Sequence, residues 1–247
     1  LNSVKVSHEK HTSACATEVM PIPESVCISM SQHIGAPCQP TVKKGDYVKV
    51  GQVIGDTDAF VSAPIHSSVS GTVREISTIR SVVGGKDTVV IIDTDGKQEV
   101  CEDVKPPVVN SREDFVKALR NSGLVGLGGA SFPTHIKFNP QNLDEVDTII
   151  VNGAECEPFI TSDHRLMLEN PEFIIEGIEV SMKYLDIKKA YIGVEENKPD
   201  AIEALRKVIA EKGLSDKIEV SVLRARYPQG AERVMIYEIK GKTLKAG

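Results

Sequence analysis

A glycine-rich stretch, residues 123–134, is the part of the sequence whose residue types most directly suggest ligand chemistry. Four glycines fall within seven residues: Gly123, Gly126, Gly128 and Gly129. Because glycine has no Cβ, the backbone N–H groups of such a loop can lie close to a ligand and form a nest for a phosphate. Lys137, just downstream, can supply a positive charge to the same phosphate. A tight turn followed by an exposed lysine is the other interpretation of these residues.

A second polar segment, residues 152–158, directly follows an apolar run and reads Asn-Gly-Ala-Glu-Cys-Glu-Pro. An amide and two carboxylates at the end of a buried strand are costly without a purpose. Asn152 offers both a donor and an acceptor, which suits a flavin ring edge or a ribityl hydroxyl. The carboxylates of Glu155 and Glu157 can accept from ribose hydroxyls or a nicotinamide amide. A polar loop that caps the next helix is the alternative.

The elements that must position these residues alternate between helix and strand from residue 111 onward. Ser111 and Asp114 form a variant of the capping box, which predicts a helix that Gly123 ends. Periodicity and apolar runs predict strands at 147–151, 190–194 and 218–223, and helices at 171–185 and 199–213. This order predicts right-handed crossovers and a mostly parallel sheet, which binds ligands at the carboxyl ends of its strands.

The two polar segments after strands are therefore expected at one edge of that sheet. They are residues 152–158 and the later Pro-Gln-Gly-Ala-Glu segment at 228–232. The glycine-rich stretch follows a helix rather than a strand, so it is not the dinucleotide fingerprint that opens a Rossmann unit.

The first part of the chain, residues 1–106, has short strand-like runs of Val, Ile, Ser and Thr with frequent turns. Residues 40–76 resemble the biotinyl/lipoyl-type barrel-sandwich module. A swinging arm would need a lysine at the hairpin tip, where residues 56–60 read Asp-Thr-Asp-Ala-Phe. We therefore expect a structural or docking role. Consecutive prolines at 106 and 107 predict a boundary between this domain and an α/β domain at 107–247.

Bulk properties exclude several classes of protein. The formal charge of the 247 residues is -6 and no basic stripe is present, which disfavours nucleic-acid binding. No apolar run approaches the roughly 20 residues of a membrane span, so we expect a soluble piece that could still dock on a membrane complex. The five cysteines include no C-x-x-C pair, which argues against a disulfide framework or a zinc site and for reduced thiols.

The motifs taken together closely resemble the RnfC subunit family of the Rnf electron-transport complexes. The resemblance covers nearly the whole chain, and its motifs lie at residues 31–37, 126–137, 152–158, 163–168, 195–199 and 227–232. More distantly, the second domain looks like the flavin-binding domain of the NADH-oxidising subunit of respiratory complex I. The resemblance implies a barrel-sandwich β domain followed by a Rossmann-like α/β domain that binds FMN and NADH.

The resemblance also implies roles for single residues. The implied cofactor-binding residues are Gly126, Gly128, Gly129, Lys137, Asn152, Glu155, Tyr227 and Gly230. The implied NADH-binding residues are Phe132, which would stack on the adenine, Glu157 and Glu232. No residue is expected to act as a catalytic acid, base or nucleophile, because the flavin performs the redox chemistry.

Two departures from the complex I pattern are expected to weaken flavin binding, because Ala154 and Ala231 stand where that pattern has acidic residues. Cys156 replaces a serine there, and we interpret it as a packed free thiol because no basic partner is apparent. The family's 4Fe-4S motifs are absent from this sequence. We therefore expect the chain to be a truncated piece whose cluster ligands lie in a missing C-terminal part.

The implied activity is hydride transfer from NADH to FMN, followed by electron transfer to 4Fe-4S clusters and on to ferredoxin, coupled to ion translocation by partner subunits. The implied location is the cytoplasmic face of the cell membrane, held there by those subunits. If this loop lies near the adenine ribose, Glu155 and Glu157 are expected to favour NADH over NADPH by repelling a 2′-phosphate. A cobalamin reductase of a bacterial microcompartment, with an RnfC-like core, is one alternative, and a docking scaffold without redox activity is another.

Overall fold

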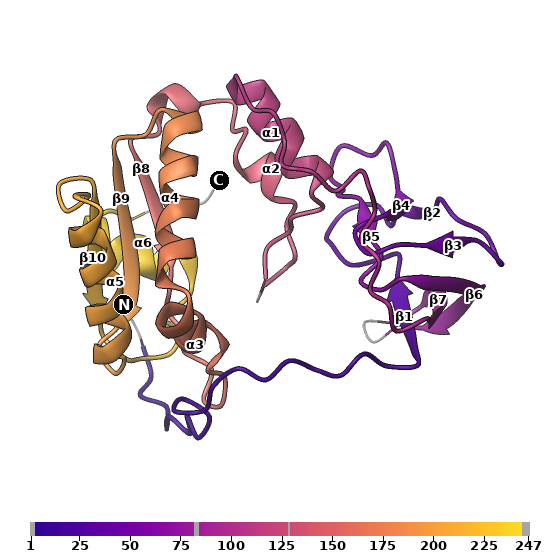
Figure 1. Cartoon of the computed structure of the whole chain (residues 1–247). Helices are drawn as coiled ribbons and strands as arrows, with labels where there is room; N and C mark the ends of the chain where they lie inside the picture. Colours follow the sequence, from indigo (N-terminus) through magenta and orange to yellow (C-terminus); the bar gives the residue numbers. More distant parts are fainter. Residues whose placement is uncertain (1–2, 82–83, 128, 244–247) are drawn as a thin grey trace. The chain divides into compact units, whose positions relative to one another are not determined.

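The structure is a computed structural model that describes residues 3–81, 84–127 and 129–243. The chain divides into two compact units (Figure 1). The barrel unit comprises residues 20–141, and the α/β unit comprises residues 1–19 together with 142–247. The N-terminal arm, which we define as residues 4–17, therefore belongs to the α/β unit.

The barrel unit is built from two antiparallel sheets. One sheet has the order β1-β7-β6-β3 and the other has the order β2-β4-β5. The strands are β1 (Ser25–Ser29), β2 (Gln39–Pro40), β3 (Tyr47–Val48), β4 (Val53–Asp56), β5 (Ile65–His66), β6 (Gly71–Arg80) and β7 (Lys86–Thr94). Buried side chains of both sheets, among them Met30, Val48, Ile54 and Ile92, form one apolar core. This arrangement confirms the predicted barrel-sandwich fold.

Two helices complete the barrel unit. The helix α1 (Arg112–Asn121) begins at Ser111, whose side chain accepts from the backbone N–H of Asp114 while the Asp114 carboxylate accepts from Ser111. The predicted capping box is therefore present. The glycine-rich stretch and the short helix α2 (Thr134–Lys137) follow α1. The rings of Phe115 and Phe138 pack edge to face, 6.0 Å between centroids, and join α1 to the end of α2.

The α/β unit has a parallel sheet of order β10-β9-β8 among the described residues, as the alternation of helix and strand predicts. Its strands are β8 (Thr148–Asn152), β9 (Lys189–Glu195) and β10 (Ile218–Leu223). The helices are α3 (Ser162–Glu169), α4 (Pro171–Leu185), α5 (Pro199–Glu211) and α6 (Glu232–Lys240), and a 3-10 turn, η1, spans Leu143–Glu145. Both α4 and α5 begin with proline at the first turn, where the missing N–H costs nothing.

The helices cover both faces of this sheet (Figure 1). Ala190, Ile192 and Val194 of β9 point to one face, into a core with residues of α4 and α5. Gly193 points to the opposite face, because successive residues of a strand alternate. A Cβ on Gly193 would lie 3.1 Å from the Met235 sulfur of α6, so α6 covers that opposite face closely. The segments that carry the predicted binding residues of this unit follow the carboxyl ends of β8 and β10.

Candidate functional site

Asn152 and Gly230 join the two polar segments of the α/β unit. Asn152 ends β8, and its side-chain Nδ2 donates to the carbonyl oxygen of Gly230 at 2.8 Å. Its Oδ1 accepts from the backbone N–H of Ala154 at 3.2 Å. The two residues are 78 positions apart in sequence. A Cβ on Gly230 would lie 3.4 Å from the Ala154 carbonyl oxygen and 3.6 Å from the Cys156 sulfur, so the segments are in close contact.

Glu155 lies behind this surface in a buried cluster of charged groups. Its side chain is only 2% exposed, and its Oε1 accepts from the backbone N–H of Asp163 at 2.8 Å. Its own N–H donates to Glu195 Oε2 at 3.1 Å, and the same oxygen accepts from Lys198 Nζ at 2.7 Å. Burial raises the pKa of the Glu155 carboxyl, while the Asp163 N–H and the charge of Lys10 oppose that rise. The carboxylate is thus occupied in holding the loop.

Three other predicted residues of the α/β unit lie on its surface. Glu157 and Glu232 are exposed, and Glu232 opens α6. Tyr227 is exposed as well, and its backbone pairs with that of Val4 in the N-terminal arm. Glu157 and Glu232 therefore present free surface for a ligand, whereas Glu155 does not.

Lys10 of the N-terminal arm was not predicted as part of the site. Its Nζ donates to three backbone carbonyl oxygens, of Glu155 at 2.8 Å, Glu157 at 2.8 Å and Ile160 at 2.5 Å. It also lies 3.7 Å from the Glu155 carboxylate. Its partners are 145 to 150 positions away in sequence, so no local pattern signals the contact.

Residues at the two ends of the glycine-rich stretch pair with each other, like the base of a hairpin. The backbone N–H of Gly126 donates to the Phe132 carbonyl at 2.9 Å, and Val125 pairs with Pro133. A Cβ on Gly129 would meet nothing within 4 Å, so this side of the hairpin is open. Phe132 and Lys137 are exposed. Gly128, also predicted to bind the cofactor, lies outside the described residues.

The barrel itself fixes the base of this hairpin. Arg120, in the last turn of α1, donates to both carboxylate oxygens of Asp56 in β4 and to the Thr57 carbonyl. Gly123 has a φ of +70°, and a Cβ there would lie 2.5 Å from the Pro64 carbonyl oxygen. The Ile34 N–H donates to the Ser131 carbonyl at 3.3 Å. Contacts with three barrel segments thus hold α1 and the hairpin.

The predicted site residues therefore fall into two groups. Asn152, Glu155, Glu157, Tyr227, Gly230 and Glu232 lie in the α/β unit, and Gly126, Gly129, Phe132 and Lys137 lie in the barrel unit. Within the α/β unit, the Asn152–Gly230 hydrogen bond joins the two polar segments. Within the barrel unit, the pairing of Val125 with Pro133 closes the base of the glycine-rich stretch.

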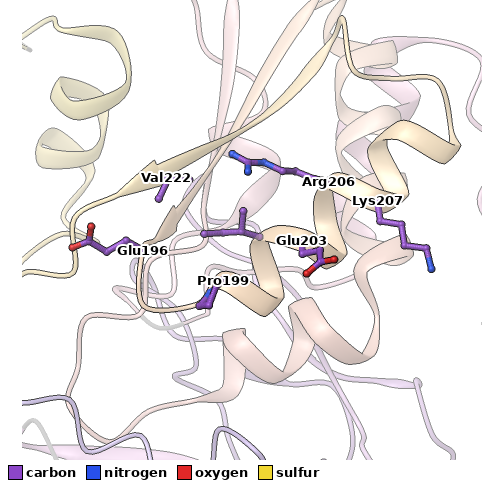
Figure 2. A pocket seen from close by; sticks show the side chains of 7 residues that line it. Glu196, Pro199, Glu203, Arg206, Lys207 and Val222 are labelled. Carbon is purple, nitrogen blue, oxygen red and sulfur yellow. The ribbon is translucent and has the colours of Figure 1, made fainter.

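A hollow of about 580 Å³ lies elsewhere, beside α5 and β10 (Figure 2). It is lined by Glu196, Pro199, Ile202, Glu203, Arg206, Lys207 and Val222. None of these is a predicted site residue. Charged side chains of α5 border it, and Val222 lines it from the edge strand β10. The hollow includes Glu196, which follows the carboxyl end of β9, but its lining does not include residues 152–158 or 227–232.

Two further features are absent from the part of the chain that the structure describes. No helix in the described ranges is both long and apolar enough to cross a bilayer. Within the same ranges, no three His, Cys, Asp or Glu side chains are grouped so that they could hold a metal ion. Cys15, Cys27, Cys38, Cys101 and Cys156 are all free thiols in the structure.

Comparison with known proteins gives two family matches. Residues 119–247 match the Nuo51 FMN-binding domain, and residues 2–97 match the RnfC barrel sandwich hybrid domain. A chain of an air-oxidized NAD+-reducing NiFe hydrogenase is 24% identical over 53% of this chain and 24% of its own length. The TM-score of that match is 0.45.

Curated relatives match over most of this chain. The C-type subunit of the proton-translocating ferredoxin:NAD(+) oxidoreductase complex of Clostridium ljungdahlii is 44% identical over 97% of this chain and 52% of the relative. Its Na(+)-translocating counterpart from Acetobacterium woodii is 44% identical over 91% of this chain and 51% of the relative. The chain spans about half the length of these relatives. It belongs to the Nuo51 FMN-binding domain family and, with the RnfC barrel sandwich hybrid domain before it, has the domain pair of an RnfC-type subunit.

Proposed function

We propose that this chain binds FMN and NADH and serves as the NADH-oxidising part of an ion-translocating ferredoxin:NAD+ oxidoreductase complex. The observation that carries the proposal is the Asn152–Gly230 hydrogen bond. It joins two segments, each predicted to bind the cofactor, at the carboxyl edge of a parallel sheet. That edge is where open α/β sheets bind ligands.

The side chains of each unit fit the chemistry of the two ligands. In the barrel unit, the open glycine hairpin and the exposed Lys137 suit a phosphate, and the exposed Phe132 ring suits stacking on a base. In the α/β unit, Asn152 retains one amide hydrogen and one acceptor lone pair beyond its bonds within the protein. Glu157 and Glu232 offer exposed carboxylates to hydroxyl or amide donors.

FMN, when bound, would supply the redox chemistry: it can accept two electrons from NADH and release them one at a time. The chain's own residues bind and orient. In the barrel unit, Lys137 would neutralise phosphate charge. In the α/β unit, Asn152 would hydrogen-bond the flavin edge or ribityl chain, and Glu157 would hold NADH. Glu155, buried behind the loop, contributes by holding the segment that carries Glu157. Tyr227 and Gly230 would offer ligand contacts in the α/β unit, and Gly126 and Gly129 would do so in the barrel unit.

The partners and the location of the complex are part of the same proposal. Both curated relatives are named as subunits of complexes that translocate protons or Na+. We therefore expect this protein to reach the cytoplasmic face of a membrane through partner subunits, and to pass electrons to 4Fe-4S clusters held outside residues 1–247.

The test is FMN and NADH binding by the full-length protein. The protein is incubated with FMN and desalted, and the retained flavin is measured by absorbance and by quenching of its fluorescence. NADH is then expected to bleach the bound flavin under anaerobic conditions. Lys137→Gln should weaken FMN binding about tenfold, because a charge-assisted hydrogen bond to phosphate is lost.

Lys117→Gln is the matched control, because Lys117 is an exposed lysine of α1 in the same unit. It should bind FMN like the unaltered protein. Full-length protein that retains no FMN would count against the proposal. Equal loss of affinity in both variants would show that Lys137 acts only through general charge.

A further inference from the structure

The N-terminal arm crosses both polar segments of the α/β unit. Val4 and Tyr227 exchange two backbone hydrogen bonds, each 2.8 Å, which attach the arm to the segment before Gly230. Farther along, the N–H of Glu9 donates to the Pro158 carbonyl at 3.0 Å. The arm is therefore tied to residues 152–160 and to residues 227–230, the same segments that the Asn152–Gly230 bond joins.

Lys10 is the central contact of the arm. An ammonium group has three N–H donors, and here all three have a carbonyl partner, on Glu155, Glu157 and Ile160. The loop must curl around one point to aim these carbonyl oxygens at it. Without the ammonium, three carbonyl dipoles would converge with no donor, which is unfavourable in a partly buried place. The conformation of residues 155–160 thus depends on Lys10.

The charge of Lys10 is balanced where it lies. Its side chain is 13% exposed, and the Glu155 carboxylate lies 3.7 Å away. Burial lowers the pKa of Lys10, and the charge of Glu155 opposes that effect. No donor approaches Glu155 Oε2 within hydrogen-bond distance among the described residues, so the ammonium is its nearest compensating group. Lys10 and Glu155 therefore support the loop from its inner side.

The arm continues past Lys10 onto α3. Thr12 and Thr161 share a hydroxyl hydrogen bond of 2.5 Å, and Arg165 donates to the Ser13 carbonyl at 3.0 Å. The N–H of Thr17 donates to Glu169 at 2.9 Å. These contacts fix the arm on both sides of Lys10, so its ammonium is held in place rather than free to leave the loop.

We propose that the N-terminal arm is part of the dinucleotide site and that Lys10 is a positioning residue, which sets the conformation of residues 155–160 and thereby the place of the Glu157 carboxylate that holds NADH. This inference rests on the proposed function. Lys10 itself touches neither ligand. Its effect reaches NADH through the backbone of Glu157, whose carbonyl it binds and whose side chain is exposed.

The test compares the full-length Lys10→Met variant with the unaltered full-length protein by hydrogen–deuterium exchange, without ligands. Peptides that cover residues 153–163 should exchange about tenfold faster, because the loss of hydrogen bonds to a charged donor loosens the loop. Peptides of β9 should be unchanged, which shows that the fold is retained. The variant should also bind NADH about tenfold more weakly, with little change in kcat, because only ground-state positioning is lost.

Lys5→Met is the matched control, since Lys5 is an exposed lysine of the same arm. It should match the unaltered protein in both measurements. Lys10→Arg should give loop exchange and NADH affinity between those of Lys10→Met and the unaltered protein. A planar guanidinium keeps the charge but cannot aim three N–H groups in the same way. If Lys10→Met does not fold, Lys10→Arg carries the test, with faster loop exchange and intact β9 protection expected.

Two outcomes would overturn the inference. One is loop exchange in both Lys10 variants equal to that of the unaltered protein. The other is faster exchange with unchanged NADH affinity. Failure of the unaltered protein to bind FMN and NADH would instead refute the proposed function, while the exchange measurement would still report whether Lys10 sets the loop conformation.

Discussion

Arg120 and Asp56 form a bidentate ion pair, with hydrogen bonds of 2.7 and 3.3 Å, that links the last turn of α1 to strand β4. Burial alone would raise the pKa of the Asp56 carboxyl, but the hydrogen bonds from Arg120 and the Thr57 N–H outweigh it and the pKa is lowered. The glycine hairpin follows α1 directly. The barrel therefore supports the hairpin, which gives this domain a role that does not require a swinging arm.

Asp56→Asn should lower the free energy of unfolding of the barrel unit by about 1 kcal/mol. The Arg120–Asp56 pair is bidentate, but both side chains are about one-third exposed and solvent screens the pair. Asp93→Asn is the control, because Asp93 pairs with Arg74 at about half exposure on both sides, so solvent screens this pair more and its loss should cost less than that of Asp56. Urea unfolding measures both, and equal costs would contradict the anchoring role of Arg120.

Gly123→Ala should destabilise the barrel unit by about 2–4 kcal/mol. The residue has a φ of +70°, which costs an alanine about 1 kcal/mol, and the new Cβ would press on the Pro64 carbonyl oxygen at 2.5 Å, which adds about 1–3 kcal/mol. Gly45→Ala separates the two effects. Gly45 has a φ of +89° in the same unit, and nothing lies within 4 Å of its Cβ position. Urea unfolding measures the free energy of unfolding of both variants. A comparable loss in the two would show that the structure relaxes around the new Cβ at residue 123 without a steric cost.

Local signals in the sequence were sufficient for much of the fold. The capping box of Ser111 and Asp114 lies within four residues, and α4 combines a proline at its start with apolar residues on one face. Strand β10 has the predicted bounds. By contrast, β2, β3 and β5 are two residues long, too short for an alternating pattern to mark their ends. The prediction therefore identified the barrel-sandwich architecture but not the limits of its strands.

The candidate site was harder to predict than the fold. The expectation that residues 152–158 and 228–232 meet at one sheet edge follows from parallel topology, and the Asn152–Gly230 bond agrees with it. The sequence could not separate Glu155 from Glu157, since both follow the same strand, yet one is buried and the other exposed. Lys10 could not be found either, because its partners are at least 145 positions away. Side-chain direction and long-range contacts need the folded chain.

Acid should weaken the barrel unit through Asp95. Its pKa is lowered to about 2 from 3.8, chiefly by the Ser70 hydroxyl, with the Lys97 N–H and the Tyr47 hydroxyl adding to the effect. A carboxyl with a depressed folded-state pKa stabilises the fold fully above its unfolded pKa, and the contribution is lost as the pH falls from about 4 to about 2. Unfolding by urea at stepped pH values should show this loss. Asp95→Asn should reduce the pH dependence within that window, and an unchanged slope would exclude Asp95 as its source.

The hydrogen bonds among Tyr47, Asp95 and Glu99 should also affect a titration at high pH. Hydrogen bonds from Tyr47 to Asp95 and Glu99 raise the pKa of Tyr47 to about 12, with Asp95 making the largest contribution. Ultraviolet titration of phenolate should show one tyrosine that ionises late, and Tyr47→Phe should remove that step. In Asp95→Asn the step should move to lower pH, because the main acceptor has lost its charge. If the late ionisation step persists in Tyr47→Phe, the step belongs to another tyrosine.

The preference for NADH over NADPH should depend on Glu157 rather than on Glu155. An acidic loop disfavours a 2′-phosphate by repulsion, but only a carboxylate that faces the ligand can act in this way. Glu157 is exposed, whereas Glu155 is 2% exposed and has Lys10 beside it at 3.7 Å. If the adenine ribose lies near this loop, Glu157→Gln should raise NADPH affinity relative to NADH by about fivefold, equivalent to about 1 kcal/mol of screened repulsion. Glu155→Gln should leave the ratio unchanged, although it can weaken both nucleotides equally by loosening the loop. The measurement is titration of the full-length protein with each nucleotide, and a ratio that responds to Glu155→Gln but not to Glu157→Gln would reverse the assignment.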